Sequence, residues 1–344
     1  MEKLLKDLLM SDGISGYEEN VASLMTSALS RVCYDVKTDT FGNVIGKLGK
    51  GKKKIMIAAH MDEIGMIVKY VNEKGFIYFS KIGGINDSIL PGEIIKIINK
   101  KGEYVTGVIG TKPPHLISLE ESKQSLKHGT MFIDIGINSR DEVLKVINIG
   151  DQITFESKAG VLNGDFYYGK AADNRIGCYA MVKVMEALLK LKNLNARIYA
   201  CATVQEEVGL KGGKIAAFKI NPDFALVIDT AVAGDMPGIK EEVSTLKLGN
   251  GVAITMVEAS GKGTVVPQKV RNIIFEAINE SNIPHQVDIF EGGMTDGAVI
   301  YTNREGVPTG VLNIPTRYIH APTSVFNIKD LNHTIDLAVK VIEK

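Results

Sequence analysis

Residues 67–164 interrupt an otherwise regular alternation of helix-like and strand-like segments, and this interruption leaves few possible architectures. On both sides of it, amphipathic helical patterns alternate with short apolar runs, as in an α/β sheet covered by helices. Within it, short β-type runs are separated by glycine turns, and sustained helical periodicity is scarce. We therefore expect a discontinuous α/β domain, residues 1–66 and 165–344, with an inserted β-rich domain at residues 67–164.

Periodicity and turn residues also predict the individual elements. In the α/β part, helices are expected at residues 18–33, 176–191, 214–218, 268–282 and 329–342, and strands at 54–59, 196–204, 224–228 and 311–314. In the insert, strands are expected at residues 76–79, 94–98, 104–109, 131–135 and 152–155. The run Lys54–Ala59 is almost continuously apolar, so we expect this strand to be buried on both faces of its sheet.

Composition and charge exclude several classes of protein. The 40 basic residues balance 40 acidic ones, giving a formal net charge of zero and a pI near 7.0, so no net field attracts nucleic acid or anionic lipid. Cys33, Cys178 and Cys201 are too few and too far apart for a disulfide framework or a CxxC metal site. No apolar run reaches the roughly 18 residues of a spanning helix, and the first residues lack the apolar stretch of a secretion signal. We expect a cytoplasmic protein without nucleic-acid or membrane partners.

Side chains that can ligate metal ions stand after the predicted strands and before one helix. They are His60, Glu206, Glu207, Asp229 and His320 after strands, and Asp173 before the helix at residues 176–191. Taken singly, each has an ordinary structural alternative, because a buried histidine is usually hydrogen-bonded and an aspartate often caps a helix or forms a turn. Ligands of open α/β sheets bind beyond the carboxyl ends of the strands, so we expect the whole set to meet at one site.

A cluster of several carboxylates requires a counter-ion. Neighbouring carboxylates repel one another and raise one another's pKa, and a divalent metal ion removes this repulsion. Two imidazoles with carboxylate oxygens suit Zn²⁺, Co²⁺ or Mn²⁺ better than Ca²⁺ or Mg²⁺, and the set is large enough for two ions that share one carboxylate. Asp62 can orient the ring of His60. The Glu206-Glu207 pair offers one metal ligand and one base for a metal-activated water.

Five motifs, in order along the chain, carry a resemblance to a known family. They are His60-Met61-Asp62-Glu63-Ile64-Gly65, Ala172-Asp173-Asn174-Arg175-Ile176-Gly177, Gln205-Glu206-Glu207-Val208-Gly209, Ile228-Asp229-Thr230 and Arg317-Tyr318-Ile319-His320-Ala321-Pro322. With these motifs the chain resembles the tetrahedral (TET) aminopeptidases, a family of co-catalytic dinuclear metallopeptidases that includes glutamyl and deblocking aminopeptidases. One stretch departs from the family's usual pattern, because Met294 precedes the Thr295-Asp296 pair.

The resemblance implies a fold, an assembly and a role for each site residue. The fold would be a zinc-peptidase-like three-layer α/β/α sandwich with an inserted PDZ-like, β-rich dimerisation domain. The assembly would be a tetrahedral homododecamer built from dimers. Asp173 would bridge two divalent ions, Zn²⁺ or Co²⁺, with His60 and Asp229 completing one site and Glu207 and His320 the other. Glu206 would be the general base, Asp62 would stand behind His60, and the Asp173-Asn174 peptide would be cis.

These expectations predict a metal-dependent aminopeptidase that removes the N-terminal residue from short peptides, with Glu206 as the base for a two-metal-activated water. An endoglucanase-type glycosidase is one alternative. Its chemistry needs two carboxyl groups that flank a sugar, which this set of carboxylates could supply, but both histidines would then have no role. A hydrolase of another small amide is a second. A third is a non-catalytic scaffold whose β-rich module binds a peptide strand at a sheet edge.

Overall fold

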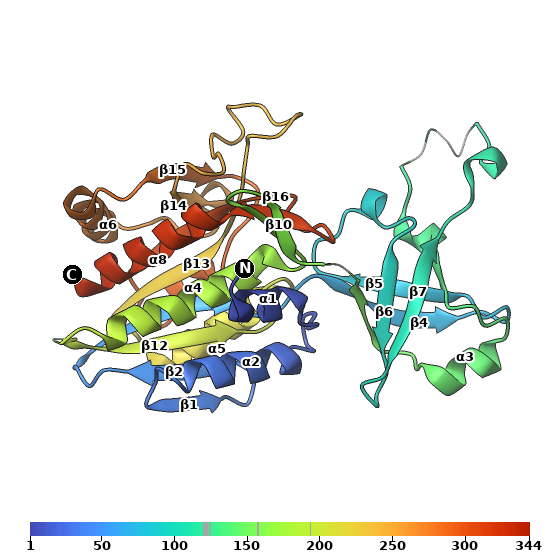
Figure 1. Ribbon diagram of the computed structural model, residues 1–344, viewed down its shortest axis with the longest axis horizontal. Coiled ribbons are helices and arrows are strands. Elements are labelled where there is room, and N and C mark those ends of the chain that lie inside the picture. The colour runs from blue at the N-terminus through green and yellow to red at the C-terminus, as the bar shows by residue number, and fades with distance from the viewer. Residues whose placement is uncertain (120–122, 124, 157, 193) are drawn as a thin grey trace. The chain divides into compact units, whose positions relative to one another are not determined.

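The central strands run parallel and are apolar on both faces, as expected for a sheet covered by helices. The computed structural model describes residues 1–119, 123, 125–156, 158–192 and 194–344. These strands pair in the order β12 (Ala196–Thr203), β3 (Lys53–His60), β13 (Phe224–Val232) and β16 (Thr309–Arg317). Each neighbouring pair is parallel, so the carboxyl ends of all four strands lie at one edge of the sheet (Figure 1).

Antiparallel strands extend this sheet on both sides. β2 pairs with β12 and carries β1, and β17 pairs with β16 and carries β11 and then β10. β14 pairs antiparallel with β16, and β15 pairs parallel with β14. The bounds are β1 (Asp35–Thr38), β2 (Val44–Leu48), β10 (Gly160–Asn163), β11 (Phe166–Gly169), β14 (Val252–Glu258), β15 (His285–Phe290) and β17 (Ser324–Asn327).

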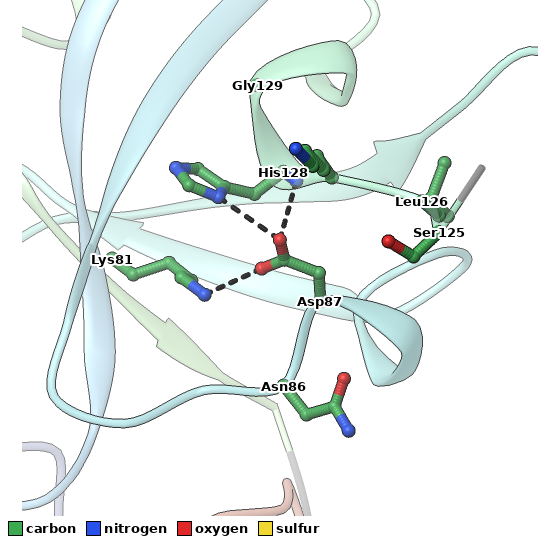
Figure 2. A pocket seen from close by; sticks show the side chains of 8 residues that line it. Lys81, Asn86, Asp87, Ser125, Leu126, His128 and Gly129 are labelled. Carbon is green, nitrogen blue, oxygen red and sulfur yellow. Dashed lines mark hydrogen bonds and ion pairs between the residues drawn. The ribbon is translucent and has the colours of Figure 1, made fainter.

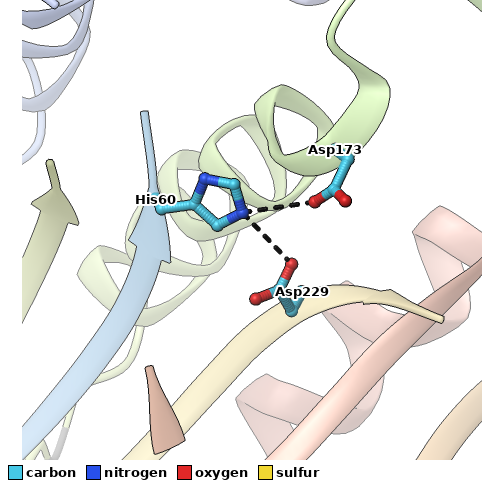
Figure 3. Close-up of side chains that lie close together, drawn as sticks. All are labelled: His60, Asp173 and Asp229. Atoms are coloured by element: carbon cyan, nitrogen blue, oxygen red, sulfur yellow. Dashed lines mark hydrogen bonds and ion pairs between the residues drawn. The ribbon is translucent and has the colours of Figure 1, made fainter. Parts of the chain in front are cut away.

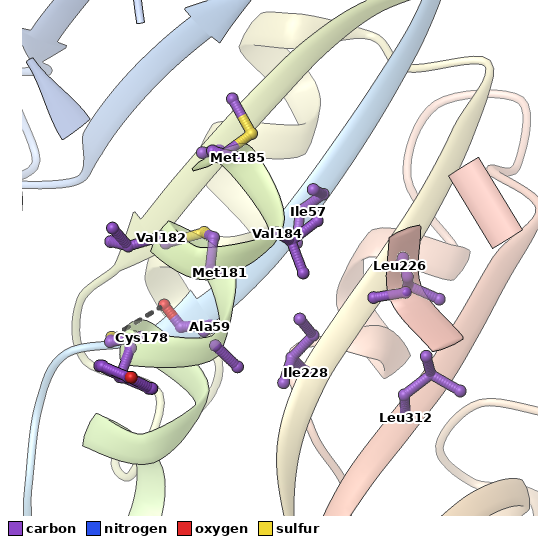
Figure 4. Close-up of a cluster of buried hydrophobic side chains, with 14 of the residues drawn as sticks. Ile57, Ala59, Cys178, Met181, Val182, Val184, Met185, Leu226, Ile228 and Leu312 are labelled. Atoms are coloured by element: carbon purple, nitrogen blue, oxygen red, sulfur yellow. Dashed lines mark hydrogen bonds between the residues drawn. The ribbon is translucent and has the colours of Figure 1, made fainter. Parts of the chain in front are cut away.

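Side chains of the central strands alternate between the two faces of the sheet, and each row enters a different hydrophobic core. On β3, Ile57 and Ala59 pack in one core, whereas Met56 and Ala58 pack in another. Figure 4 shows part of the first core, where side chains of helix α4 such as Met181 face the strands. A strand buried in this way has no polar face, which explains its nearly continuous apolar sequence.

Helices cover both faces of the sheet. The helices that contribute to the first core are α1 (Lys3–Met10), α2 (Glu19–Leu29), α4 (Ala172–Leu189), α6 (Gln268–Ser281) and α8 (Ile328–Glu343). Those of the second core are α5 (Lys211–Ile220) and α7 (Gly297–Tyr301). This succession of helices, sheet and helices confirms the predicted three-layer α/β/α class.

The inserted segment forms a closed β-barrel with its own core. Its strands pair around the barrel in the order β4, β5, β8, β7, β6, β9 and back to β4. Cross-strand pairs such as Ile95 with Phe155 and Ile97 with Ile153 point inward and are buried. The bounds are β4 (Gly65–Val71), β5 (Ile77–Ile82), β6 (Ile94–Ile98), β7 (Tyr104–Gly110), β8 (Phe132–Asp134), β9 (Gln152–Phe155) and helix α3 (Arg140–Val146). The insert is therefore β-rich, and its likeness to a PDZ domain stays a prediction.

By its contacts, the chain divides into two compact units. The first comprises Met1–Asp62, Lys158–Ile319 and Thr323–Lys344, and the second comprises Glu63–Ser157 and His320–Pro322. The sequence places the boundaries of the inserted domain after residue 66 and before residue 165, and these bounds stay a prediction. Residues 160–163 and 166–169 form β10 and β11, which continue the sheet of the first unit. Among the described residues, no helix combines the length and the apolar character needed to cross a membrane.

Candidate metal centre

The order of the central strands brings three of the predicted site segments to one edge of the sheet. β3 ends at His60, which is paired in register with Thr203, the last residue of β12. β13 pairs with β3 on its other side and carries Asp229. The pairing of β13 with β3 extends only to Val227, so the Asp229 carboxylate follows the point where the two strands separate.

His60, Asp173 and Asp229 form a cluster in which each residue offers one ligand atom, all within 4.8 Å of one another. His60 Nε2 lies 3.2 Å from Asp173 Oδ1 and 3.6 Å from Asp229 Oδ1 (Figure 3). His60 is 2% exposed and Asp229 is 4% exposed, so water screens this cluster weakly.

The hydrogen bond on the other side of the His60 ring assigns its tautomer. Nδ1 lies 3.1 Å from the backbone oxygen of Asp62, which can only accept, so Nδ1 carries the proton. In the neutral ring, the form that ligates metal ions, Nε2 is then an acceptor that faces the oxygens of Asp173 and Asp229. A cation holds these three acceptors together, either a proton on Nε2 or a metal ion between them. The donor set therefore fits a divalent metal ion that accepts nitrogen and oxygen ligands.

Asn174 positions Asp173 at the start of α4. Asp173 and Asn174 have non-helical backbone angles, and the peptide bond between them is cis, as the family resemblance implies. The Asn174 side chain donates to the Ile228 carbonyl at 2.8 Å and accepts from the Gly177 N–H at 3.1 Å. Asn174 thus ties the start of α4 to β13, one residue before Asp229. Sequence reasoning did not assign Asn174 a role, and its position next to a predicted ligand was the available signal.

Asp62 holds the loop that carries Glu206 and Glu207. Its Oδ1 accepts the Glu206 backbone N–H at 3.0 Å, and its Oδ2 accepts the Glu207 backbone N–H at 3.1 Å. Oδ2 also accepts the Ser15 hydroxyl at 2.6 Å, and Oδ1 lies 3.4 Å from His60 Nδ1. Asp62 therefore orders this loop as well as facing the His60 ring. The role expected from sequence included only the ring.

Glu206 stands beside the cluster without belonging to it. Its Oε2 lies 3.8 Å from His60 Nε2, and its side chain is 11% exposed. The preceding residue, Gln205, has a φ of 56° and donates its backbone N–H to Glu18 at 3.0 Å. This turn directs Glu206 toward the end of β3.

Burial and crowding perturb the ionisation of the cluster. Burial raises the pKa of Asp229 to about 7 and that of Glu206 well above its ordinary value. For His60, burial acts to lower the pKa, but the carboxylates of Asp229 and Glu206 outweigh it and hold the pKa well above the ordinary value. The charged forms of Asp229 and Glu206 are thus disfavoured by burial, a cost that a bound metal ion would offset.

Asp296 is a further buried carboxylate near this site. Its Oδ2 accepts the Thr203 hydroxyl at 2.6 Å, and burial raises its pKa to about 6. It thereby anchors the last residue of β12, from which the Glu206 loop begins. Met294, the departure from the family pattern, is 42% exposed.

His320 belongs with Ala321 and Pro322 to the second unit. Its Nδ1 lies 3.0 Å from the Gly84 carbonyl oxygen, which fixes the ring within that unit. Its participation with Asp173 and Glu207 in a second metal site stays a prediction.

The second unit also contains a polar pocket that sequence reasoning missed (Figure 2). Lys81 donates to Asp87 Oδ1 at 2.6 Å, and the His128 backbone N–H donates to Asp87 Oδ2 at 3.0 Å. Nothing in the sequence pairs Asp87 with His128, because the barrel brings them together across 41 positions.

Comparison with known proteins places the chain in a family. The M42 glutamyl aminopeptidase family matches residues 42–337. A candidate aminopeptidase of Acetivibrio thermocellus is 39% identical over 346 residues, which cover 99% of this chain and 98% of the relative. The solved aminopeptidase of the archaeon Desulfurococcus kamchatkensis is 36% identical with a TM-score of 0.94, covering 99% of this chain and 94% of its own. A TET peptidase of Pyrococcus horikoshii that can assemble into a tetrahedron or a large octahedral shell is 32% identical with a TM-score of 0.86, covering 98% of each chain.

The chain therefore belongs to the M42 glutamyl aminopeptidase family. The resemblance to TET aminopeptidases drawn from the five motifs is confirmed.

Proposed function

We propose that the protein is a metal-dependent aminopeptidase that removes the N-terminal residue from short peptides. The observation that carries this proposal is the buried cluster in which His60 Nε2 faces the carboxylates of Asp173 and Asp229. Membership of an aminopeptidase family supports the reaction class. The cluster supports the metal dependence, because an imidazole nitrogen and two carboxylates are donors that a divalent ion such as Zn²⁺ binds.

In this proposal, two divalent ions are held by residues of this chain, Zn²⁺ or Co²⁺ being preferred by the nitrogen and oxygen donors. His60, Asp173 and Asp229 hold one ion, and Asp173, Glu207 and His320 hold the other. The bound ions would polarise the scissile carbonyl and acidify the attacking water.

Glu206 is proposed as the general base. Its carboxylate takes the proton from the attacking water and later delivers it to the leaving amine, a transfer that contributes typically 10²–10⁴-fold to such reactions. Asp62 positions Glu206 through the backbone N–H bond at 3.0 Å, and it keeps the His60 proton on Nδ1. Asp62 also accepts the Glu207 N–H. It therefore fixes the backbone of the proposed base, Glu206, relative to that of the proposed ligand, Glu207.

The proposal extends to the assembly. The match to a peptidase that assembles into a tetrahedron supports a homododecamer built from dimers, with the inserted barrel as the dimerisation domain.

A substrate panel tests the function directly. Aminoacyl-nitroanilides and their N-acetylated forms are incubated with Zn²⁺- or Co²⁺-loaded protein, with and without chelator. We expect cleavage of the free-amine substrates only, and loss of that cleavage with chelator. Cleavage of neither set by protein with two bound metal ions would contradict the proposal.

The same panel separates the alternatives. Cleavage of the N-acetylated forms alone would identify a hydrolase of another small amide, and peptide binding without turnover would identify a scaffold. Chelator-resistant release of sugars from a polysaccharide would identify a glycosidase. We do not favour the last alternative because a glycosidase needs two carboxyl groups about 5–9.5 Å apart and has no use for a histidine between them.

A further inference from the structure

A basic pocket lies on the first unit, on the face of the sheet that α5 covers. Its cavity measures about 230 Å³ and is lined by Lys37, Ile45, Lys47, Lys54, Tyr199, Lys219 and Ile220. None of these residues belongs to the metal centre. Tyr199 precedes Thr203 by four residues on β12, which is roughly 13 Å along a strand, so the pocket lies toward the opposite end of the strands from His60.

Strand pairing explains why the lysines gather here. Residues directly opposite each other on neighbouring strands point to the same face of a sheet. Lys37 of β1 lies opposite Ile45 of β2, and Lys47 of β2 lies opposite both Asp35 of β1 and Tyr199 of β12. Lys54 lies two residues before Met56, the partner of Tyr199, so it shares that face. The last turn of α5 adds Lys219.

The pocket carries an excess of positive charge. Among the described residues, Asp35 is the only acidic side chain that pairs with any of its four lysines, at 2.8 Å from Lys47 and 3.6 Å from Lys37. Lys54 donates to the Ile220 carbonyl at 2.9 Å, a bond that stabilises the C-terminus of α5. Lys54 therefore has a structural role of its own. Lys37 keeps 73% of its side chain exposed and Lys219 is exposed, so both ammonium groups can move to meet a ligand.

Tyr199 also lines the pocket, and as a whole residue it is 8% exposed. Its hydroxyl can both donate and accept a hydrogen bond, so it adds a neutral polar group to the lysines. It lies close enough to Lys47 to influence the pKa of that lysine. Ile45 and Ile220, both 6% exposed, supply apolar walls beside it.

We propose that this pocket binds a small phosphate-bearing molecule. Lysine ammonium groups bind phosphate as point charges, and the Tyr199 hydroxyl donates one further hydrogen bond to a phosphate oxygen. The volume is below the roughly 300–1,000 Å³ of sites for drug-sized ligands, so the ligand is no larger than a short phosphate ester. The ligand binds away from the metal centre and is not the peptide substrate.

Calorimetric titration of the metal-loaded protein tests this proposal with inorganic phosphate and glycerol 3-phosphate as probes. We expect saturable binding that weakens at least about 10-fold in the double variant Lys37→Gln/Lys219→Gln, because two of the four charges are lost. Tyr199→Phe weakens binding several-fold. Tighter binding of glycerol 3-phosphate than of inorganic phosphate identifies an ester as the ligand, and equal binding identifies free phosphate.

The matched control is the double variant Lys6→Gln/Lys269→Gln, which removes the same charge from exposed lysines elsewhere. It should bind phosphate as the original protein does. Equal affinity in all variants, equal loss in the control, or no binding at millimolar phosphate would overturn the proposal. The titration is repeated after chelation, and binding that disappears with the metal would also overturn it, since phosphate would then be held at the metal centre.

Discussion

At the scale of single residues, Asp62 and Asn174 do as much to build the site as the proposed metal ligands. Asp62 accepts three hydrogen bonds, from Ser15, Glu206 and Glu207, and faces the His60 ring. Asn174 joins the start of α4 to β13. These bonds hold the ligands and the base in a fixed geometry, which is what metal binding and proton transfer require.

Glu206→Gln tests the proposed base. We expect kcat to fall by about 10²–10⁴, because the amide cannot accept the proton, while the metal content measured by atomic spectroscopy stays the same. The comparison variant Glu207→Gln should instead lose metal as well as activity, because Glu207 is a proposed ligand. An unchanged kcat in fully metal-loaded Glu206→Gln would remove Glu206 from the mechanism.

At the scale of elements, the start of α4 is held by a buried arginine. Arg175 is 0% exposed and donates to the backbone oxygens of Leu8 at 3.0 Å, Ser11 at 3.0 Å and Gly13 at 3.2 Å. It therefore satisfies carbonyls at and beyond the C-terminus of α1, which a helix leaves without intrahelical partners. The packing of α1 on α4 depends on this side chain.

Arg175→Met should lower the free energy of unfolding by about 3–5 kcal/mol, because three carbonyls lose a charged donor inside the protein. Urea denaturation measures the change, and hydrogen exchange should increase in α1. Arg31→Met, at an exposed position, is the control and should change stability by less than about 0.5 kcal/mol. A loss in Arg175→Met as small as that of the control would show that α1 does not depend on Arg175.

In the barrel, Asp87 makes stability depend on pH. Burial acts to raise its pKa, but Lys81 and the His128 N–H outweigh burial and hold the pKa at about 2, below the ordinary 3.8. The ionised form is thus favoured in the folded state, so its stabilisation is complete well above pH 3.8 and is lost as the pH falls toward 2. Asp87→Asn should cost about 1 kcal/mol at pH 7 and at pH 5, and less at pH 3. Urea denaturation at the three pH values checks this, and a constant difference down to pH 3 would contradict it.

At the scale of the whole molecule, the metal centre couples activity to stability. The cluster of His60, Asp173 and Asp229 is assembled only in the folded state, so a metal ion should bind that state and stabilise it. Chelation should lower the melting temperature and abolish activity, and Zn²⁺ or Co²⁺ should restore both. Mg²⁺ serves as the control and should restore little, because it prefers oxygen ligands. Full activity after verified metal removal would contradict a metal-dependent reaction.

Assembly is the second property of the whole molecule. We expect light scattering to give a mass near twelve times the 37.3 kDa of the chain. A dimer as the smaller species in dilute solution would agree with assembly from dimers. A monomer at all concentrations would contradict the proposed homododecamer.

The sequence by itself determined the class of fold and most of the α/β elements. The helices of 176–191, 268–282 and 329–342 and the strands of 54–59 and 196–204 are all present, because each has a strong periodicity or a continuous apolar run. It missed α1, whose eight residues are few for a periodicity argument, and it missed β14 and β15. It also indicated that His60, Asp173 and Asp229 would meet, because the carboxyl ends of parallel strands share one edge.

Only the tertiary structure decided how these side chains are held and what lies elsewhere on the sheet. The bonds of Asp62 to Glu206 and Glu207 span more than 140 positions, and no local pattern specifies such contacts. The closure of the insert into a barrel depends on the pairing of β9 with β4, strands far apart in the chain. The basic pocket likewise depends on the register of β1, β2 and β12, since a slip of one residue would turn its lysines to the other face. Sequence periodicity determines which face of an element is apolar, whereas partners and register are chosen by packing among distant segments.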